Sequence, residues 1–285
     1  MTVKKILVAG AGNMGAGIAQ LCAQRGFETV LTDITLELSS RGKSLIDKGM
    51  QKRVDQGKIT QAEKDLVLSR ISIAGDLSPA KECDFVIESV FENLEIKRGV
   101  FAQLDNMVGA DVILATNTTS LPISDIAEAT RRPERVVQMH FFNPPTIMKL
   151  VEIMPGRKTA PETVKAAEEM AKQLGKDPVV CKIEAPAGIV SRVLGQLLNE
   201  ASWLVASGVA EPADVDKAMK LGANHPMGPL ELLDLIGLDV HRAKMETLTT
   251  TLNDPRYKHP EIIDRMIEEG RLGRKVGKGF YNYED

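Results

Sequence analysis

Residues 5–15 read Lys5-Ile-Leu-Val-Ala-Gly10-Ala-Gly12-Asn-Met-Gly15, an apolar run that passes directly into spaced glycines. The apolar run has the pattern of a buried strand, and the stretch from Met14 to Arg25 is compatible with a helix. A second apolar run, Phe27 to Leu31, then leads to Asp33. A strand, a glycine-rich turn, a helix and a second strand ending at an acidic residue are the parts of a dinucleotide-binding βαβ unit.

Each part of this motif has a physical role. Gly10 permits the tight turn, Gly12 lets the backbone approach a pyrophosphate with no Cβ in the way, and Gly15 lets the helix lie close to the strand. Unpaired N–H groups at the helix N-terminus attract phosphates, while Asp33 can accept hydrogen bonds from both ribose hydroxyls and would repel a 2′-phosphate. The motif therefore predicts NAD as cofactor; the alternative is an ordinary glycine-rich turn of another α/β protein. The motif residues expected to contact NAD are Gly10, Gly12, Asn13, Met14, Gly15 and Asp33.

The composition argues against several classes of protein. The net charge of −3 gives no reason to expect a nucleic acid or an anionic membrane surface as partner. We find no apolar run of the roughly eighteen residues that a membrane span needs. The three cysteines are far apart and lack C-x-x-C spacing, so we expect reduced, packed side chains in a cytoplasmic protein, and no metal site. A chain of 285 residues is long enough for two domains.

Up to about residue 183, β-type runs alternate with helical patterns, which predicts an α/β fold with a doubly wound sheet of the Rossmann type. The first, fourth and fifth runs are almost uniformly apolar, as expected for strands covered on both faces. The expected strands are Ile6–Ala9, Thr29–Asp33, Ile71–Ala74, Phe85–Ile87, Val112–Ala115, Val136–His140, Leu150–Met154 and Val179–Ile183.

The stretch from Glu37 to Arg70 predicts a helical hairpin inserted after the second strand. It is rich in lysine and arginine, which has two interpretations. The charges are either a solvated face or an arm that reaches a phosphorylated substrate, and the residues alone favour neither.

The composition changes after Pro186, where every longer pattern becomes helical. We therefore expect a nucleotide-binding domain over residues 1–186 and an all-α domain over residues 187–285. The helices expected in the second domain are Ile189–Ala206, Pro212–Leu221, Leu230–Thr251 and Glu261–Glu269.

Oxidation of an alcohol by a nicotinamide cofactor needs a base near the hydroxyl group. His140 lies at the end of an apolar strand, and the carboxyl ends of strands face the cofactor crevice in an open sheet. Glu152 lies in the next strand-like run, so a turn can bring it back beside His140. A buried carboxylate would fix the tautomer of the ring and stabilise the imidazolium. The remaining histidines are interpreted as structural or exposed: His225, His241 and His259.

Several longer motifs resemble those of the short-form bacterial 3-hydroxyacyl-CoA dehydrogenase family, most nearly the 3-hydroxybutyryl-CoA dehydrogenases. The resemblance covers essentially the whole chain. The motifs are Gly10-Ala-Gly-Asn-Met-Gly-Ala-Gly17, Asn117-Thr-Thr-Ser-Leu121, Met139-His-Phe-Phe-Asn-Pro144, Met148-Lys-Leu-Val-Glu152, Leu221-Gly-Ala-Asn-His-Pro-Met-Gly-Pro-Leu230 and Leu272-Gly-Arg-Lys-Val-Gly-Lys-Gly-Phe-Tyr281.

The resemblance implies an L-3-hydroxyacyl-CoA substrate, a catalytic pair formed by His140 and Glu152, and a helical C-terminal domain that makes a homodimer. Further family positions for NAD contacts, beside Asp33, fall on Glu92, Lys97, Asn143 and Lys275. Family positions that hold the CoA portion of the substrate fall on Lys48, Lys52 and Arg53, with looser individual matches.

Two residues depart from the family pattern. Thr119 replaces a serine whose hydroxyl meets substrate and cofactor, and Ser191 replaces an active-site asparagine. Threonine keeps the hydroxyl, whereas serine loses the amide donor, and loss of one polar contact to a developing charge can cost about 10²-fold in rate. Either a water fills the gap, or the substrate differs from a simple short acyl thioester.

We therefore expect an NAD-dependent oxidoreductase that interconverts an (S)-3-hydroxyacyl-CoA, most nearly 3-hydroxybutyryl-CoA, and the 3-oxoacyl-CoA. His140 acts as the acid–base group, Glu152 orients it, and Thr119 and Ser191 hold the substrate oxygens. One alternative is a dehydrogenase of the same family that acts on another hydroxy acid or on a longer or dicarboxylic acyl-CoA. Another is a catalytically weak NAD-binding protein.

Overall fold

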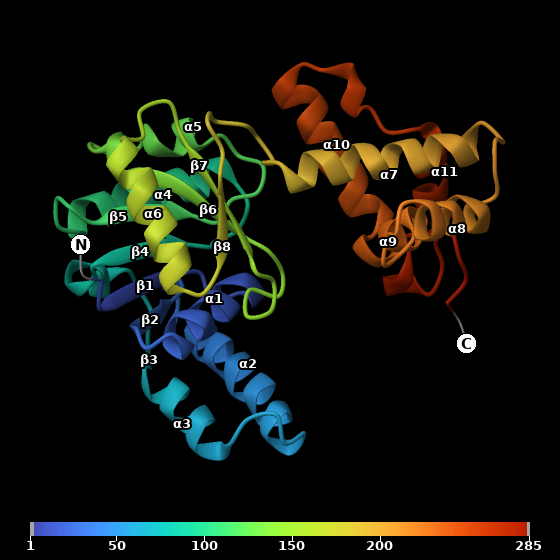
Figure 1. The fold of residues 1–285 in the computed structure, drawn as a ribbon. Coiled ribbons are helices and arrows are strands. Elements are labelled where there is room, and N and C mark those ends of the chain that lie inside the picture. Colours follow the sequence, from blue (N-terminus) through green and yellow to red (C-terminus); the bar gives the residue numbers. More distant parts are fainter. Residues whose placement is uncertain (1–2, 284–285) are drawn as a thin grey trace. The chain divides into compact units, whose positions relative to one another are not determined.

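The computed structural model of the chain describes residues 3–283. The chain divides into two compact units, with the division between Ala185 and Pro186. The first unit contains all eight strands named among the described residues, and the second is helical (Figure 1). The described residues also contain four short 3₁₀ helices: Ser78–Glu82, Pro133–Arg135, Pro255–Tyr257 and Arg274–Val276.

One eight-stranded sheet forms the centre of the first unit, in the order β3-β2-β1-β4-β5-β6-β7-β8. The first six strands are parallel, β7 runs antiparallel to β6, and β8 is parallel to β7. The doubly wound sheet predicted from the apolar runs is confirmed. The strands are β1 (Lys5–Ala9), β2 (Glu28–Thr32), β3 (Ile71–Ala74), β4 (Phe85–Glu88), β5 (Ile113–Thr116), β6 (Val136–Phe141), β7 (Leu150–Pro155) and β8 (Asp177–Val180).

Helices cover both faces of this sheet because successive strand residues point to opposite sides. Ile6 and Val8 of β1 join a core with residues of α1, α2, α3 and α6, whereas Leu7 and Ala9 join a second core with residues of α4 and α5. The helices are α1 (Asn13–Gln24), α2 (Leu36–Asp55), α3 (Gln61–Ser69), α4 (Leu94–Met107), α5 (Ile123–Ala127) and α6 (Pro161–Gln173).

Helices α2 and α3 form the predicted hairpin, which projects beyond the sheet in blue and cyan in Figure 1. Local capping explains where both helices begin. The Thr35 side chain accepts a hydrogen bond from the backbone N–H of Leu38 at the start of α2. Thr60 and Glu63 form a reciprocal capping box at the start of α3.

The edge strand β8 lies two to three residues earlier than the sequence predicts. Its pairing begins with Asp177 opposite Leu150 and ends with Val180 opposite Ile153. Val179 and Val180 are about 40% exposed, as expected at a sheet edge. The apolar pattern therefore does not predict where this strand begins and ends.

The second unit contains five helices among its described residues, one more than the sequence predicts. The predicted single helix over residues 230–251 is broken at Gly237, whose φ of 101° cannot continue a helix. The helices are α7 (Val190–Ala206), α8 (Pro212–Gly222), α9 (Pro229–Ile236), α10 (Leu238–Leu252) and α11 (Glu261–Glu268). No helix within residues 3–283 is long and apolar enough to cross a membrane.

Candidate active site

The glycine-rich turn between β1 and α1 has the close backbone approaches that the motif requires. Gly10 has a φ of 103°, and a Cβ on it would lie 2.4 Å from the carbonyl oxygen of Ser89. A Cβ on Gly15 would lie 1.8 Å from the carbonyl oxygen of Gly10, so any larger residue would push α1 off the turn. By contrast, no heavy atom lies within 4 Å of the Cβ position of Gly12, which leaves space for a ligand at the start of α1.

Asp33 lies beside this turn in a fixed orientation. One carboxylate oxygen accepts a hydrogen bond from the backbone N–H of Ala11 (2.8 Å) and the other from that of Ile34 (2.8 Å). A pocket of about 660 Å³ is lined by Gly12, Asp33 and Thr119, and a smaller pocket of about 270 Å³ shares Asp33 as a lining residue. The open Gly12 position and the Asp33 carboxylate fit the pyrophosphate and the ribose of a dinucleotide.

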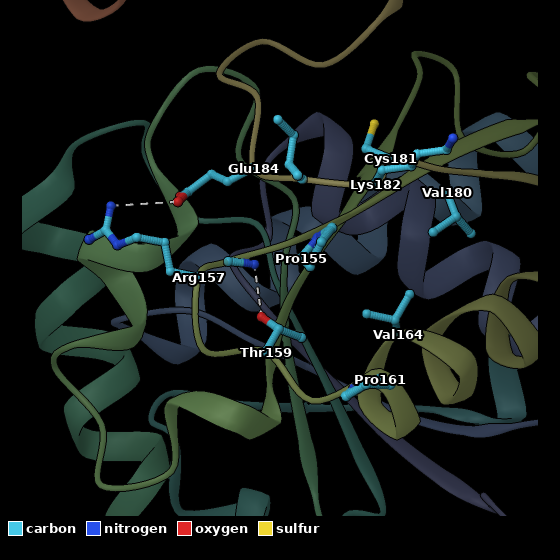
Figure 2. A pocket seen from close by; sticks show the side chains of 11 residues that line it. Pro155, Arg157, Thr159, Pro161, Val164, Val180, Cys181, Lys182 and Glu184 are labelled. Carbon is cyan, nitrogen blue, oxygen red and sulfur yellow. Dashed lines mark hydrogen bonds and ion pairs between the residues drawn. The ribbon is translucent and has the colours of Figure 1, made fainter.

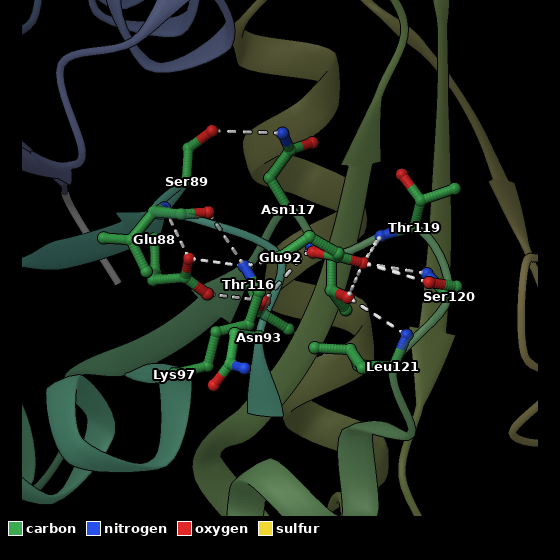
Figure 3. A network of polar contacts seen from close by, with 12 residues as sticks. Glu88, Ser89, Glu92, Asn93, Lys97, Thr116, Asn117, Thr119, Ser120 and Leu121 are labelled. Atoms are coloured by element: carbon green, nitrogen blue, oxygen red, sulfur yellow. Dashed lines mark hydrogen bonds and ion pairs between the residues drawn. The ribbon is translucent and has the colours of Figure 1, made fainter. Parts of the chain in front are cut away.

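A buried ion pair lies next in sequence to Ser89 and Val90, which line this pocket (Figure 3). Lys97 Nζ is 2.7 Å from Glu88 Oε1, and both side chains are at most 1% exposed. Glu88 Oε1 also accepts from the Val90 N–H (2.6 Å), and Oε2 accepts from the Thr116 hydroxyl (2.7 Å). The sequence did not indicate Glu88, because its carboxylate at the end of an apolar strand has no motif of its own. The amine of Lys97 is turned toward Glu88, and its predicted contact with NAD stays a prediction.

Glu92 organises the loop that follows β5 (Figure 3). Its Oε1 accepts hydrogen bonds from the Thr118 hydroxyl (2.6 Å) and from the backbone N–H groups of Thr119 (2.9 Å) and Ser120 (3.1 Å). Burial raises the pKa of this carboxyl, but the charge of Lys97 and these hydrogen bonds outweigh burial, so the net pKa is lowered. Glu92 also lines the 660 Å³ pocket, so it holds Thr119 while facing the space for a ligand.

His140 and Glu152 are direct cross-strand partners in the antiparallel pair of β6 and β7. His140 Nδ1 lies 3.1 Å from Glu152 Oε2, and both side chains are buried. The other ring nitrogen, Nε2, lies 3.3 Å from the Thr119 hydroxyl. A carboxylate on Nδ1 favours the tautomer in which Nε2 is the free acceptor, so this arrangement can take a proton from a hydroxyl near Thr119.

The backbone after His140 is fixed by a residue that the sequence did not single out for a role. Asn117 Oδ1 accepts from the Phe141 N–H (2.8 Å), and Asn117 Nδ2 donates to the Ser89 hydroxyl (3.2 Å). This side chain therefore links the ends of β4, β5 and β6. Asn143, a predicted NAD contact, is exposed in the loop that follows β6.

The three predicted CoA contacts lie on the hairpin helix α2. Lys48 and Lys52 are exposed one turn apart, and Arg53 is half-buried next to Lys52. None of these three side chains forms a hydrogen bond or an ion pair with another residue of the described chain. Arg41 and Lys64 on the same hairpin are paired, with Glu37 and Asp47 respectively, whereas Lys58 in the turn also has no ion pair within the described residues. The unpaired cluster is what a ligand phosphate would need, although a solvated face would look the same.

Two predicted site residues, Ser191 and Lys275, belong to the second unit. Ser191 is buried near the start of α7, and Lys275 Nζ lies 2.6 Å from both carboxylate oxygens of Asp239. Their roles toward substrate and NAD stay predictions.

The other histidines have structural environments. His241 is fully buried, and its Nε2 lies 2.8 Å from Asn199 Oδ1. Burial lowers the pKa of His241 to about 3, and nearby positive charge contributes. His259 Nε2 lies 3.1 Å from both carboxylate oxygens of Asp264, and His225 is half-buried.

A larger pocket of about 750 Å³ lies where the chain leaves β7 and β8 (Figure 2), and it holds none of the predicted site residues. Its one arginine, Arg157, lies 3.5–3.8 Å from the carboxylates of Asp125, Glu128 and Glu184. Because acidic groups already surround this cation, the pocket is a poor phosphate site.

Comparison with known proteins identifies one family. Residues 5–184 match "3-hydroxyacyl-CoA dehydrogenase, NAD binding domain", and residues 189–283 match "3-hydroxyacyl-CoA dehydrogenase, C-terminal domain". A Deinococcus radiodurans protein named "Probable 3-hydroxybutyryl-CoA dehydrogenase" is 46% identical over 279 residues, which cover 98% of this chain and 100% of that protein. A Clostridioides difficile 3-hydroxybutyryl-CoA dehydrogenase is 43% identical over 279 residues, covering 98% of this chain and 99% of that protein.

The fold leads to the same family. The crystal structure of the (S)-3-hydroxybutyryl-CoA dehydrogenase of Ralstonia eutropha matches with a TM-score of 0.95 and 39% identity, and the match covers 100% of both chains. These matches confirm the resemblance, the fold class and the cofactor that the sequence motifs predict. The chain belongs to the 3-hydroxyacyl-CoA dehydrogenase family and is an NAD-dependent dehydrogenase.

Proposed function

We propose that the chain interconverts an (S)-3-hydroxyacyl-CoA, most nearly (S)-3-hydroxybutyryl-CoA, and the corresponding 3-oxoacyl-CoA. The main support is the row formed by Thr119, His140 and Glu152, in which a carboxylate orients the imidazole and a hydroxyl marks the place of the substrate oxygen. The similarity to named 3-hydroxybutyryl-CoA dehydrogenases supports the short acyl chain.

In the oxidation, His140 Nε2 takes the proton of the substrate hydroxyl. Bound NAD supplies the acceptor for the hydride that leaves C3. Glu152 holds the ring by its Nδ1 side and stabilises the positive charge that the imidazole gains. Thr119 donates a hydrogen bond from its hydroxyl to the substrate oxygen, and Ser191 is proposed, from the family resemblance alone, to hold a substrate oxygen. In the reduction, the imidazolium returns the proton to the oxygen.

We further propose that Lys48, Lys52 and Arg53 bind the phosphates of CoA. Their support is that they are cationic, grouped on one helix and without a partner in the described chain. In this arrangement Thr119 and His140 contact the acyl end of the substrate, and the three cations of α2 contact its phosphates. Binding through a remote phosphate contributes to affinity in the ground and transition states alike.

We also propose a homodimer formed by the second unit, in a cytoplasmic enzyme. Val193 and Trp203 on α7 and Val240 on α10 are large apolar side chains that are 66%, 46% and 49% exposed in the single chain. The three cysteines are free and buried, as suits a reducing compartment. Light scattering at micromolar concentration tests the dimer: a mass of one chain would contradict it.

The activity is tested by mixing the protein with acetoacetyl-CoA and NADH and following the loss of reduced-nicotinamide absorbance. We expect turnover with this short substrate that exceeds turnover with free acetoacetate. Turnover only with another 3-oxo acid or a longer acyl-CoA would support the alternative substrate that the Thr119 and Ser191 replacements suggest. NADH binding without turnover of any 3-oxoacyl-CoA would mean a catalytically weak NAD-binding protein.

A further inference from the structure

Lys176 is a buried cation with an unusual set of partners. It lies in the turn between α6 and β8, and its side chain is 6% exposed. Its ammonium group donates to the carbonyl oxygens of Pro145 (2.5 Å) and Met148 (2.8 Å). Within residues 3–283 no carboxylate forms an ion pair with it. Burial, with the charge of Arg25, lowers the pKa of Lys176. The two carbonyl oxygens that offset the cost of burying this amine both belong to one loop.

That loop, residues 142–149, joins the two strands that carry His140 and Glu152. The Phe142 ring lies 4.6 Å from the His140 ring, measured between centroids. Asn143 follows directly. At the other end of the loop, the carbonyl oxygen of Lys149 accepts from the N–H of Asp177, the neighbour of Lys176. The position of the loop therefore bears on the surroundings of the catalytic imidazole.

The same loop also touches the helix that begins at the glycine-rich turn. A Cβ on Gly17 of α1 would lie 2.9 Å from Cδ of Pro145, so the proline ring packs directly on α1. Pro145 thus has α1 against its ring and Lys176 on its carbonyl oxygen. One short segment connects the pyrophosphate-binding end of the fold to the His140 strand.

We propose that Lys176 is a positioning residue for the dehydrogenase reaction: by holding the carbonyls of Pro145 and Met148 it keeps Phe142 and Asn143 in place beside His140 and the cofactor pocket. Lys176 does not line that pocket and touches no reacting atom, so it acts through the loop. The inference rests on the proposed role of His140 and on Asn143 as an NAD contact.

The test compares Lys176→Met, which removes the donors, with Lys176→Arg, which restores donors, and with Lys172→Met. Lys172 is exposed on α6 and pairs with Glu168 and Glu169, so it controls for the loss of one lysine charge. We expect Lys176→Met to lower kcat at least about tenfold and to raise the Kd of NADH about threefold or more, because small displacements of catalytic groups are costly. Lys176→Arg should recover part of both effects, and Lys172→Met should stay within about twofold of wild type.

A double-mutant cycle on the Kd of NADH separates positioning from general loss of structure. If Lys176 acts through the loop, Asn143→Ala should weaken NADH binding less in the Lys176→Met background than in wild type. One NADH bound per chain shows that the variant is folded. If Lys176→Met does not fold, Gly17→Ala, which presses on Pro145 from α1, should give the same loss of kcat and NADH affinity.

Additive effects in the cycle, or a wild-type kcat and Kd in a folded Lys176→Met variant, would overturn the inference. Failure of the proposed function is distinguishable from this result. Retained turnover in His140→Ala would refute the role of His140, while the cycle on NADH binding still reports on the loop.

Discussion

Removal of the Lys97 amine tests the buried ion pair that Lys97 forms with Glu88. In Lys97→Met, the Glu88 carboxylate stays fully buried and loses its 2.7 Å contact with the ammonium group, and Glu92 loses its 3.4 Å ion pair with the same group. The Val90 N–H and the Thr116 hydroxyl remain as donors, but no charge compensates the carboxylate at this distance. A buried charge without its partner costs about 3–5 kcal/mol in the free energy of unfolding. Lys172→Met, on an exposed lysine, should change this free energy by less than about 1 kcal/mol.

The double variant Glu88→Gln/Lys97→Met removes both charges and keeps acceptor and donor atoms at residue 88. It should therefore be more stable than Lys97→Met alone, since the cost lies in the unpaired charge. Urea titrations followed by far-UV circular dichroism measure the difference. The single tryptophan, Trp203, lies in the second unit, so its fluorescence identifies the transition that should not move. A Lys97→Met variant as stable as Lys172→Met, or a double variant less stable than the single one, would show that an unpaired Glu88 charge does not destabilise the first unit.

Three further predictions concern the cofactor, the hairpin and pH. Because the Asp33 carboxylate would face a 2′-phosphate, kcat/KM should favour NADH over NADPH by at least about tenfold, or roughly 1.4 kcal/mol; equal values would contradict this. Neutralising Lys48, Lys52 and Arg53 together should raise KM for acetoacetyl-CoA more than it lowers kcat, with a smaller effect in added salt; an unchanged KM would mean solvated surface. Burial lowers the pKa of His241 in the folded chain from its ordinary value of 6.5 to about 3. As pH falls below about 6.5, the unfolded chain therefore binds a proton that the folded chain does not bind. The free energy of unfolding of the second unit should fall from there toward pH 3. Urea titrations at pH 7 and pH 5, followed by Trp203 fluorescence, should show a smaller pH difference in His241→Gln than in wild type, and an equal difference would exclude His241 as the cause.

The sequence predicts the first unit well because its strands are buried on both faces and read as apolar runs. The pairing of His140 with Glu152 is predictable for the same reason, since a short return between two such runs places them opposite each other. The predicted bounds of the edge strand β8 are wrong because its exposed residues do not form a clear apolar run. The predicted single helix over residues 230–251 is wrong because Gly237 interrupts it with a positive φ.

Buried charges were the main features that the sequence could not indicate. Glu88 and Lys176 read as ordinary polar residues, and only tertiary structure shows that an ammonium group or two carbonyl oxygens meet them. Asn117 belongs to a family motif, but its structural role is hidden in the sequence because its two hydrogen bonds join strands that are far apart in the chain. Such contacts depend on how strands are ordered in the sheet, which local patterns do not encode.

The proposed function depends most on His140 as the acid–base group of an NAD-dependent 3-hydroxyacyl-CoA dehydrogenase. The most direct measurement compares wild type and His140→Ala for two quantities: kcat with acetoacetyl-CoA and NADH, and the Kd of NADH without substrate. We expect kcat to fall at least about 10²-fold while the Kd changes less than about threefold, because the base contributes to proton transfer and not to cofactor binding. More than about a tenth of the wild-type kcat in His140→Ala, with NADH bound normally, would contradict the account.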